Sequence, residues 1–172
     1  VDTSTLHINN GLKTLSPNEI EITVVTNPTC PGCKVLHDSL SKAIATFKEH
    51  ISIQYLFLVD PTQKNKKAYQ IATLILSLPL HVQEQAINEW FNATNEIAWK
   101  KKWLTEKLDI QKGYESLVDQ VIWCNEQKIN YSPTLTINNR IIPNNYTSNQ
   151  IKDLITAIKT QQTTARHLNT TD

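Results

Sequence analysis

The stretch IEITVVTNPTCPGC, residues 20–33, contains the pattern from which the fold can be predicted. Residues 20–26 are rich in β-branched side chains and alternate along the chain, which is typical of a buried β-strand. The strand ends before Pro28, and Pro31 stands where a helix would begin, a position that suits proline. From there apolar residues recur every three or four positions, which predicts an amphipathic helix over residues 31–49.

A second strand pattern, ISIQYLFLV (51–59), completes a β-α-β unit and is expected to be well buried. Such a unit favours parallel strands joined by a right-handed crossover. Residues from about 61 to 128 show no strand pattern, so we expect an all-helical insertion there, with its first helix opened by Pro61. All four tryptophans lie in this segment at helical spacing. Packing is their default role, and a substrate groove is the alternative.

A hairpin and a final helix are predicted after the insertion. Residues 134–137 and 140–142 have strand patterns, and the two asparagines between them tolerate the positive φ of a tight turn. Thr147 and Gln150 have the spacing of a capping box, which predicts that an amphipathic helix begins there.

The composition is that of one globular domain over residues 1–172, of which 40% are hydrophobic. A net charge of +1 argues against a nucleic-acid partner or an anionic membrane surface.

We expect an edge strand near residues 6–8 and a polar, frayed tail over about 160–172. The chain contains no methionine, so we interpret it as part of a longer product whose targeting segment lies elsewhere.

The CPGC motif holds two of the three cysteines of the chain. At a strand-to-helix junction Cys30 lies at the helix N-terminus, where unpaired N–H groups and the helix dipole favour its thiolate. Cys33 lies one turn further on the apolar face, where it can attack a mixed disulfide formed at Cys30. A CxxC that follows a strand and opens a helix is a strong signal of thiol–disulfide exchange.

Two other uses of these cysteines have less support. A zinc site needs four ligands, and without a second CxxC it would depend on Cys124 and a histidine meeting in the fold. A structural disulfide would close a very small loop and add little stability. Cys124 lies on an apolar helical stripe and is interpreted as a buried free thiol. His37 is interpreted as an exposed residue that could instead tune the dithiol.

The order of these elements resembles the thioredoxin fold over about residues 18–160. The resemblance implies an α/β protein in which helices flank a central mixed sheet. The all-helical insertion between the second core strand and the C-terminal hairpin is similar to that of the DsbA-like disulfide oxidoreductases. The motifs TNPTCPGC, Trp123-Cys124 and SPTLTINNR are also similar to the thioredoxin-like domain fused to vitamin K epoxide reductase-type membrane domains in some bacteria.

The resemblance implies roles for individual residues. Cys30 would be the nucleophile and Cys33 the resolving cysteine. Pro133 would be the cis-proline that faces the dithiol, and Ser132 would offer its backbone to a substrate strand. The residues that could tune the dithiol are Pro31, Gly32, Lys34 and His37.

Position 24 departs from the family pattern. Many thioredoxin-like proteins carry a buried carboxylate six residues before the nucleophile, where this chain has Val24. Glu21 belongs to the other face of the strand, so proton transfer at Cys33 would rely on water, Lys34 or backbone groups, or would be slow. Pro31-Gly32 matches neither the common reducing nor the common oxidising motif, so the direction of electron transfer stays open.

The sequence therefore predicts an exported thiol–disulfide oxidoreductase, periplasmic or otherwise extracytoplasmic, as the soluble part of a membrane-anchored protein. Its partners would be protein thiols and disulfides, and a quinone-linked, vitamin K epoxide reductase-like membrane domain would re-oxidise it. No cofactor and no metal are expected. The alternative is a thioredoxin-like binding module in which the dithiol is a redox-sensitive latch without turnover.

Overall fold

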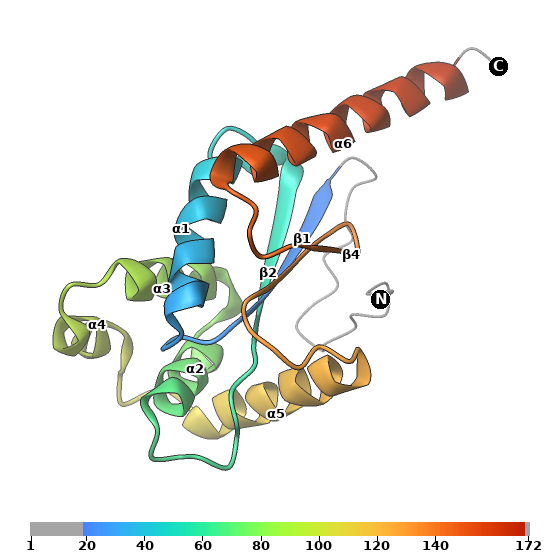
Figure 1. Cartoon of the computed structure of the whole chain (residues 1–172). Coiled ribbons are helices and arrows are strands. Elements are labelled where there is room, and N and C mark those ends of the chain that lie inside the picture. The colour runs from blue at the N-terminus through green and yellow to red at the C-terminus, as the bar shows by residue number, and fades with distance from the viewer. Residues whose placement is uncertain (1–18, 171–172) are drawn as a thin grey trace.

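The computed structural model describes residues 19–170, and the edge strand expected near residues 6–8 lies outside them. The strands of the described residues are β1 (Ile20–Thr26), β2 (Ile51–Phe57), β3 (Thr134–Ile137) and β4 (Arg140–Ile142). The helices are α1 (Pro31–Ile44), the short 3-10 helix Lys48–His50, α2 (Lys67–Ser77), α3 (Leu80–Asn92), α4 (Glu96–Trp103), α5 (Ile110–Glu126) and α6 (Ser148–Asn169). Only helices lie between β2 and β3, as predicted (Figure 1).

The sheet has the strand order β2-β1-β3-β4 and is mixed. β1 pairs in parallel with β2 and antiparallel with β3, and β3 pairs antiparallel with β4. β1 therefore has a neighbour on both sides, and Ile20, Ile22 and Val25 are fully buried. β2 has only one neighbour among the described strands, so most of it is half-buried, where the sequence predicted a buried strand.

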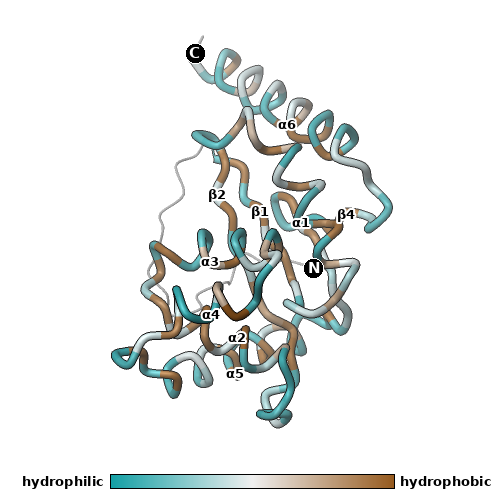
Figure 2. Tube along the Cα trace, turned by 90° about the vertical axis from the view of Figure 1, so that its left-hand side faces the viewer, coloured by the Kyte–Doolittle hydropathy of each residue, from teal (hydrophilic) through white to brown (hydrophobic). Residues whose placement is uncertain are grey.

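Different helices cover the two faces of the sheet. Ile22 and Val24 belong to a core that includes Leu36 of α1 and Ile151 of α6. Val25, the next residue along β1, belongs instead to a core that includes residues of α5. This is the alternation expected of a strand buried on both faces. Apolar residues accordingly follow β1 and β2 through the middle of the molecule (Figure 2).

Two helices begin or end differently from the sequence prediction. α1 ends at Ile44 rather than at residue 49, because the chain closes a turn in which the Phe47 N–H donates to the Ile44 carbonyl at 2.9 Å. α2 begins at Lys67 rather than at Pro61. The Asp60 carboxylate accepts a hydrogen bond from the Thr62 N–H at 2.9 Å, which favours a turn over a helix at this point.

The hairpin and the capping box form as predicted. Asn138 and Asn139 have φ values of 46° and 67°, in the left-handed region. The Asn138 side-chain oxygen also accepts a hydrogen bond from the Glu21 N–H at 2.9 Å, which attaches the turn to β1. Thr147 and Gln150 form both hydrogen bonds of the capping box.

The tail that we expected to be frayed is helical as far as Asn169. Only Ile151 and Ile155 of α6 are buried, and the C-terminal half of this helix extends away from the rest of the molecule (Figure 1). Several threonine hydroxyls in this half donate to the carbonyl group four residues earlier, so these polar groups have partners within the helix itself. The polar sequence is therefore compatible with a helix.

Gly113 allows α5 to approach α2 closely. A Cβ atom at this position would lie 2.1 Å from the Thr73 carbonyl oxygen and 2.2 Å from the Ser77 hydroxyl oxygen. We expect Gly113→Ala to lower the free energy of unfolding by roughly 1–3 kcal/mol, because the two helices must move apart. Urea unfolding measures this loss. Glu115→Ala, at an exposed position of the same helix, is the control and should leave stability close to that of the wild type.

Candidate active site

Cys30 is the N-cap residue of α1, directly after the turn that follows β1. Its carbonyl oxygen accepts the N–H groups of Cys33 at 3.1 Å and Lys34 at 3.2 Å, which begins the helix. Pro31 occupies the first turn, as predicted. The Cys30 side chain is partly exposed, whereas Cys33 is 1% exposed. The outer and inner positions predicted for the two sulfurs are therefore confirmed.

Four groups surround the Cys33 sulfur in addition to the apolar core. The Asn27 N–H donates to Cys33 Sγ at 3.3 Å. Burial raises the pKa of Cys33, the Asn27 N–H and the Thr26 and Ser132 side chains lower it, and Cys30 raises it. Burial has the largest effect, so the pKa of Cys33 lies above its ordinary value of 9.0. Cys33 is therefore a protonated thiol at neutral pH.

The loop before β3 lies across from the dithiol. The Cys30 thiol donates to the Ser132 carbonyl oxygen at 4.0 Å, although the two residues are far apart in sequence. The Ser132–Pro133 peptide bond is cis, as the resemblance implied. A Cβ atom at Gly32 would lie 3.5 Å from Pro133 Cδ and 3.8 Å from Cys30 Sγ. The fold thus brings Cys30, Cys33, Ser132 and Pro133 together at one end of the sheet.

Lys34 extends from α1 toward α3. Its ammonium group donates to the Phe91 carbonyl oxygen and lies 3.6 Å from a carboxylate oxygen of Asp38. The structure therefore gives this lysine a contact with the helical insertion, and no hydrogen bond from it to either sulfur is found among the described residues.

The interpretation of His37 as an exposed residue is wrong. His37 is 3% exposed, with its ring centroid 4.8 Å from that of Phe91 and 6.1 Å from that of Tyr55. Neither ring nitrogen has a hydrogen-bond partner among the described residues. Burial lowers the pKa of His37, with a smaller opposing effect from Asp38. The residue is buried because α3 covers this part of α1, which periodicity along α1 alone does not predict.

Among residues 19–170, no carboxylate replaces the one that is missing at Val24. Val24 pairs with Tyr55 of β2 and Leu135 of β3 in the middle of the sheet. Glu21 lies near the start of β1, opposite Ser52, where partial burial raises its pKa. None of the groups that perturb Cys33 is a carboxylate.

Cys124 is fully buried on α5, with Val25, Leu56 and Ile129 in its core cluster. Burial raises the pKa of Cys124 to about 11. The interpretation of Cys124 as a buried free thiol is therefore confirmed, and the residue takes no part in the dithiol site.

A groove of about 540 Å³ lies beside the turn that precedes Cys30. Asn27 and Thr29 line it on one side, and residues between positions 58 and 68 line it on the other, including Lys66 and Lys67. Asp60 in the lining offsets the charge of Lys66, and Lys67 is paired with Glu96 at 2.9 Å, so the lining carries little net charge.

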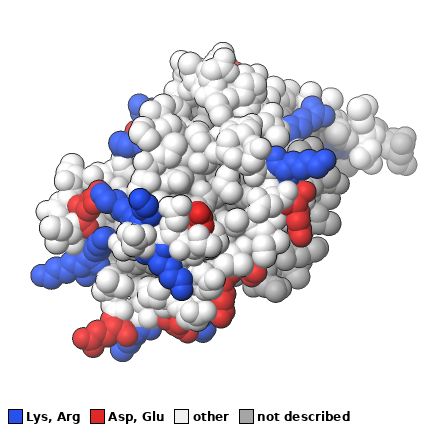
Figure 3. All heavy atoms as spheres, turned by 60° about the horizontal axis from the view of Figure 1, so that its bottom comes forward, with Lys and Arg blue, Asp and Glu red and all other residues white. Residues whose placement is uncertain are grey.

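Acidic and basic side chains are mixed over the face that Figure 3 shows, without a large area of one sign. Among residues 19–170, no three His, Cys, Asp or Glu side chains are grouped so that they could hold a metal ion. Within the same range, no helix combines the length and the hydrophobicity that crossing a membrane requires.

The architecture matches that of solved ScsC and DsbA1 structures. ScsC from Proteus mirabilis in a transitional conformation superposes with a TM-score of 0.66 at 14% identity, over 88% of this chain and 72% of that chain. Reduced DsbA1 from Neisseria meningitidis gives a TM-score of 0.55 at 17% identity, over 90% and 92% of the two chains. The chain has a DsbA-like thioredoxin fold. The catalytic domain of Proteus mirabilis ScsC gives 0.61 at 14% identity, over 86% and 85%.

No protein-family model matches the chain, and no curated protein matches it by sequence. At identities this low, the superpositions show a shared DsbA-like fold, and the function has to be argued from the site.

The sequence analysis missed two parts of that site. They are the Asn27 N–H that faces Cys33 and the Trp90 indole, which donates to the Pro28 carbonyl oxygen at 2.7 Å. The strand end at residues 27–28 could have indicated the first, whereas no sequence signal indicates the second.

The exposure of the three thiols predicts selective alkylation. We expect brief treatment of the reduced protein with iodoacetamide at neutral pH to modify Cys30 and to leave Cys33 and Cys124 unmodified. Both inner thiols are buried, and burial raises the pKa of each. Peptide mass spectrometry locates the label, and the unfolded protein, which should be labelled at all three cysteines, is the control. Labelling of Cys33 or Cys124 at the rate of Cys30 would contradict the described burial.

His37 should make the protein less stable in mild acid. Its pKa in the folded protein lies below its ordinary value of 6.5, so the unfolded chain binds the proton first as the pH falls. The free energy of unfolding should therefore decrease below about pH 6.5, and His37→Leu should reduce this dependence. Urea unfolding at several pH values measures it. The control is His81→Gln, at an exposed position, which should leave the dependence unchanged.

Proposed function

We propose that this protein is a thiol–disulfide oxidoreductase that exchanges disulfides with protein substrates through Cys30 and Cys33. The observation that carries the proposal is the position of the two sulfurs. Cys30 lies partly exposed at a helix N-terminus opposite Ser132, and Cys33 is buried one turn behind it. The DsbA-like fold supports the same activity.

The exchange proceeds in two steps when a substrate disulfide is reduced. The Cys30 thiolate attacks one substrate sulfur, which forms a mixed disulfide and releases the other substrate sulfur as a thiolate. The Cys33 thiolate then attacks Cys30 Sγ, and the second substrate sulfur leaves. The substrate gains two electrons and the protein ends with a Cys30–Cys33 disulfide. The reverse sequence transfers the disulfide to a substrate dithiol.

The second step requires a base, because Cys33 must lose its proton before it attacks. The raised pKa of Cys33 keeps the proton in place at neutral pH, while the Asn27 N–H stabilises the anion once it forms. Since no carboxylate of the described residues perturbs Cys33, we propose water at the partly exposed Cys30 side as the proton acceptor. Pro31 and Gly32 would influence the equilibrium through the geometry of this first turn.

The substrate would bind beside Ser132 and Pro133. An extended peptide next to this loop could pair with the backbone of Ser132, which already contacts the Cys30 thiol. The groove lined by Asn27 and Thr29 lies next to the same turn and offers space for the substrate chain beyond its cysteine. Because acidic and basic side chains both line the groove, it suits a polar polypeptide rather than a strongly acidic or strongly basic one.

The cellular setting that we propose is periplasmic or otherwise extracytoplasmic, since the disulfides of substrate proteins form and persist in oxidising compartments. The similarity of TNPTCPGC and SPTLTINNR to domains fused to vitamin K epoxide reductase-type proteins supports a quinone-linked membrane partner of this type as the oxidant. Such a partner would take two electrons from the Cys30–Cys33 dithiol and restore the disulfide.

Single cysteine variants test the proposed exchange. Cys33→Ser should accumulate a mixed disulfide between Cys30 and a disulfide-containing substrate protein, because the resolving thiol is absent. Cys30→Ser should abolish the exchange. Cys124→Ser is the matched control and should retain it, since Cys124 is fully buried. Non-reducing electrophoresis detects the mixed disulfide, and a glutathione buffer measures the equilibrium of the wild-type pair.

The latch alternative makes the opposite prediction. A binding module would hold its partner after Cys30→Ser and would show no turnover of dithiol or disulfide substrates in its wild-type form. That combination of results would overturn the proposed enzyme activity.

A further inference from the structure

The C-terminal end of α3 contacts the chain on both sides of the CPGC motif. Before the motif, the Trp90 indole N–H donates to the Pro28 carbonyl oxygen at 2.7 Å. After the motif, the Phe91 carbonyl oxygen accepts a hydrogen bond from Lys34, and the Phe91 ring packs on His37. Two consecutive residues of the helical insertion thus contact the segments that enter and leave the dithiol.

The Pro28 carbonyl belongs to the turn that holds both sulfurs. Asn27, the preceding residue, donates its N–H to Cys33 Sγ at 3.3 Å and accepts the Cys30 N–H on its carbonyl oxygen at 3.2 Å. The Asn27 side-chain oxygen accepts the Thr29 N–H at 2.9 Å. The Pro28 carbonyl shares its peptide group with the Thr29 N–H, so a rotation of that group would disturb the turn whose hydrogen bonds place Asn27 against Cys30 and Cys33.

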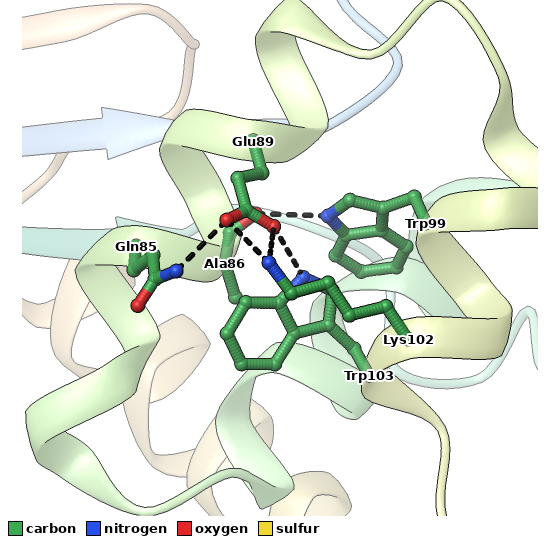
Figure 4. Close-up of polar contacts among 6 residues, drawn as sticks. All are labelled: Gln85, Ala86, Glu89, Trp99, Lys102 and Trp103. Atoms are coloured by element: carbon green, nitrogen blue, oxygen red, sulfur yellow. Dashed lines mark hydrogen bonds and ion pairs between the residues drawn. The ribbon is translucent and has the colours of Figure 1, made fainter.

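The Trp90 ring packs within the helical insertion. It is 8% exposed, and its ring meets that of Trp99 edge to face at a centroid distance of 5.0 Å. The Trp99 indole N–H donates to the Ala86 carbonyl oxygen on α3 at 3.1 Å. Glu89 accepts hydrogen bonds from Lys102 and from the Trp103 indole, which ties α4 to α3 (Figure 4).

We propose that Trp90 is a positioning residue for the dithiol and that its indole hydrogen bond to Pro28 stabilises the reduced pair relative to the disulfide. Through Pro28 it orients the Asn27 N–H toward Cys33. In the protein with free thiols the Cys33 sulfur accepts the Asn27 N–H, so a change that turns this N–H away removes a stabilising contact from the reduced pair. The inference rests on the proposed exchange at Cys30 and Cys33, and it assigns part of the redox equilibrium to the helical insertion.

The test compares Trp90→Phe with Trp99→Phe in the whole chain. Both variants keep an aromatic ring and remove a buried indole N–H that donates to a backbone carbonyl, but only Trp90 donates to the active-site turn. Each protein is equilibrated with glutathione buffers, quenched in acid and alkylated, and the fraction of Cys30–Cys33 disulfide is measured by mass. Thermal unfolding of both variants reports the general loss of stability.

Trp90→Phe should favour the disulfide by about 3- to 10-fold in the equilibrium constant, the effect expected of one lost hydrogen bond. The equilibrium constant of Trp99→Phe should remain close to that of the wild type, even if its thermal stability decreases as much as that of Trp90→Phe. Equal constants for the two variants would overturn the inference. A wild-type pair that does not exchange with glutathione at all would overturn the proposed function instead.

A measurement on the unaltered protein covers the case in which Trp90→Phe does not fold. The indole N–H resonances of Trp90 and Trp99 are followed by nuclear magnetic resonance as the dithiol is oxidised. The Trp90 resonance should shift, because its acceptor lies in the turn that contacts both sulfurs, whereas that of Trp99 should shift less. A Trp90 resonance that is the same in both redox states would overturn the inference.

Discussion

The hydrogen bonds of Asn27 join the end of β1 to the start of α1, and the geometry of the candidate site depends on them. β1 is buried on both faces and paired on both edges, so the point at which it ends is fixed by the core. The turn at Asn27 then determines where Cys30 begins the helix and how closely a backbone N–H approaches Cys33. The loop that contains Ser132 and Pro133 reaches the same place because β3 pairs with β1.

The three thiols differ mainly in how far the core encloses them. Cys30 is partly exposed, Cys33 is buried one helical turn behind it, and Cys124 is buried on the other side of the sheet. Burial raises the pKa of Cys33 and of Cys124. In the proposed exchange, the burial of Cys33 distinguishes the resolving sulfur from the attacking sulfur of Cys30, one helical turn away. This difference follows from position alone, since the three side chains are chemically identical.

The sequence predicted those features that depend on local patterns. The strand over residues 20–26, the CPGC helix start, the hairpin asparagines and the Thr147 capping box are all set by near neighbours, and all formed as expected. His37 was misassigned because its burial depends on α3, which is far away in sequence. The Trp90–Pro28 hydrogen bond could not be predicted for the same reason, and the half-buried β2 reflects its place at one edge of the described sheet.

The close spacing of Cys30 and Cys33 limits what their oxidation can change. Cys30 is the N-cap of α1 and Cys33 lies in its first turn, so a bond between them would cross-link neighbours that the helix start already holds near each other. It would tie no distant parts of the chain together and would leave the layers of the sheet and helices as they are. A partner that distinguishes the two redox forms must therefore recognise the few atoms around the outer sulfur, because the overall shape carries no such information.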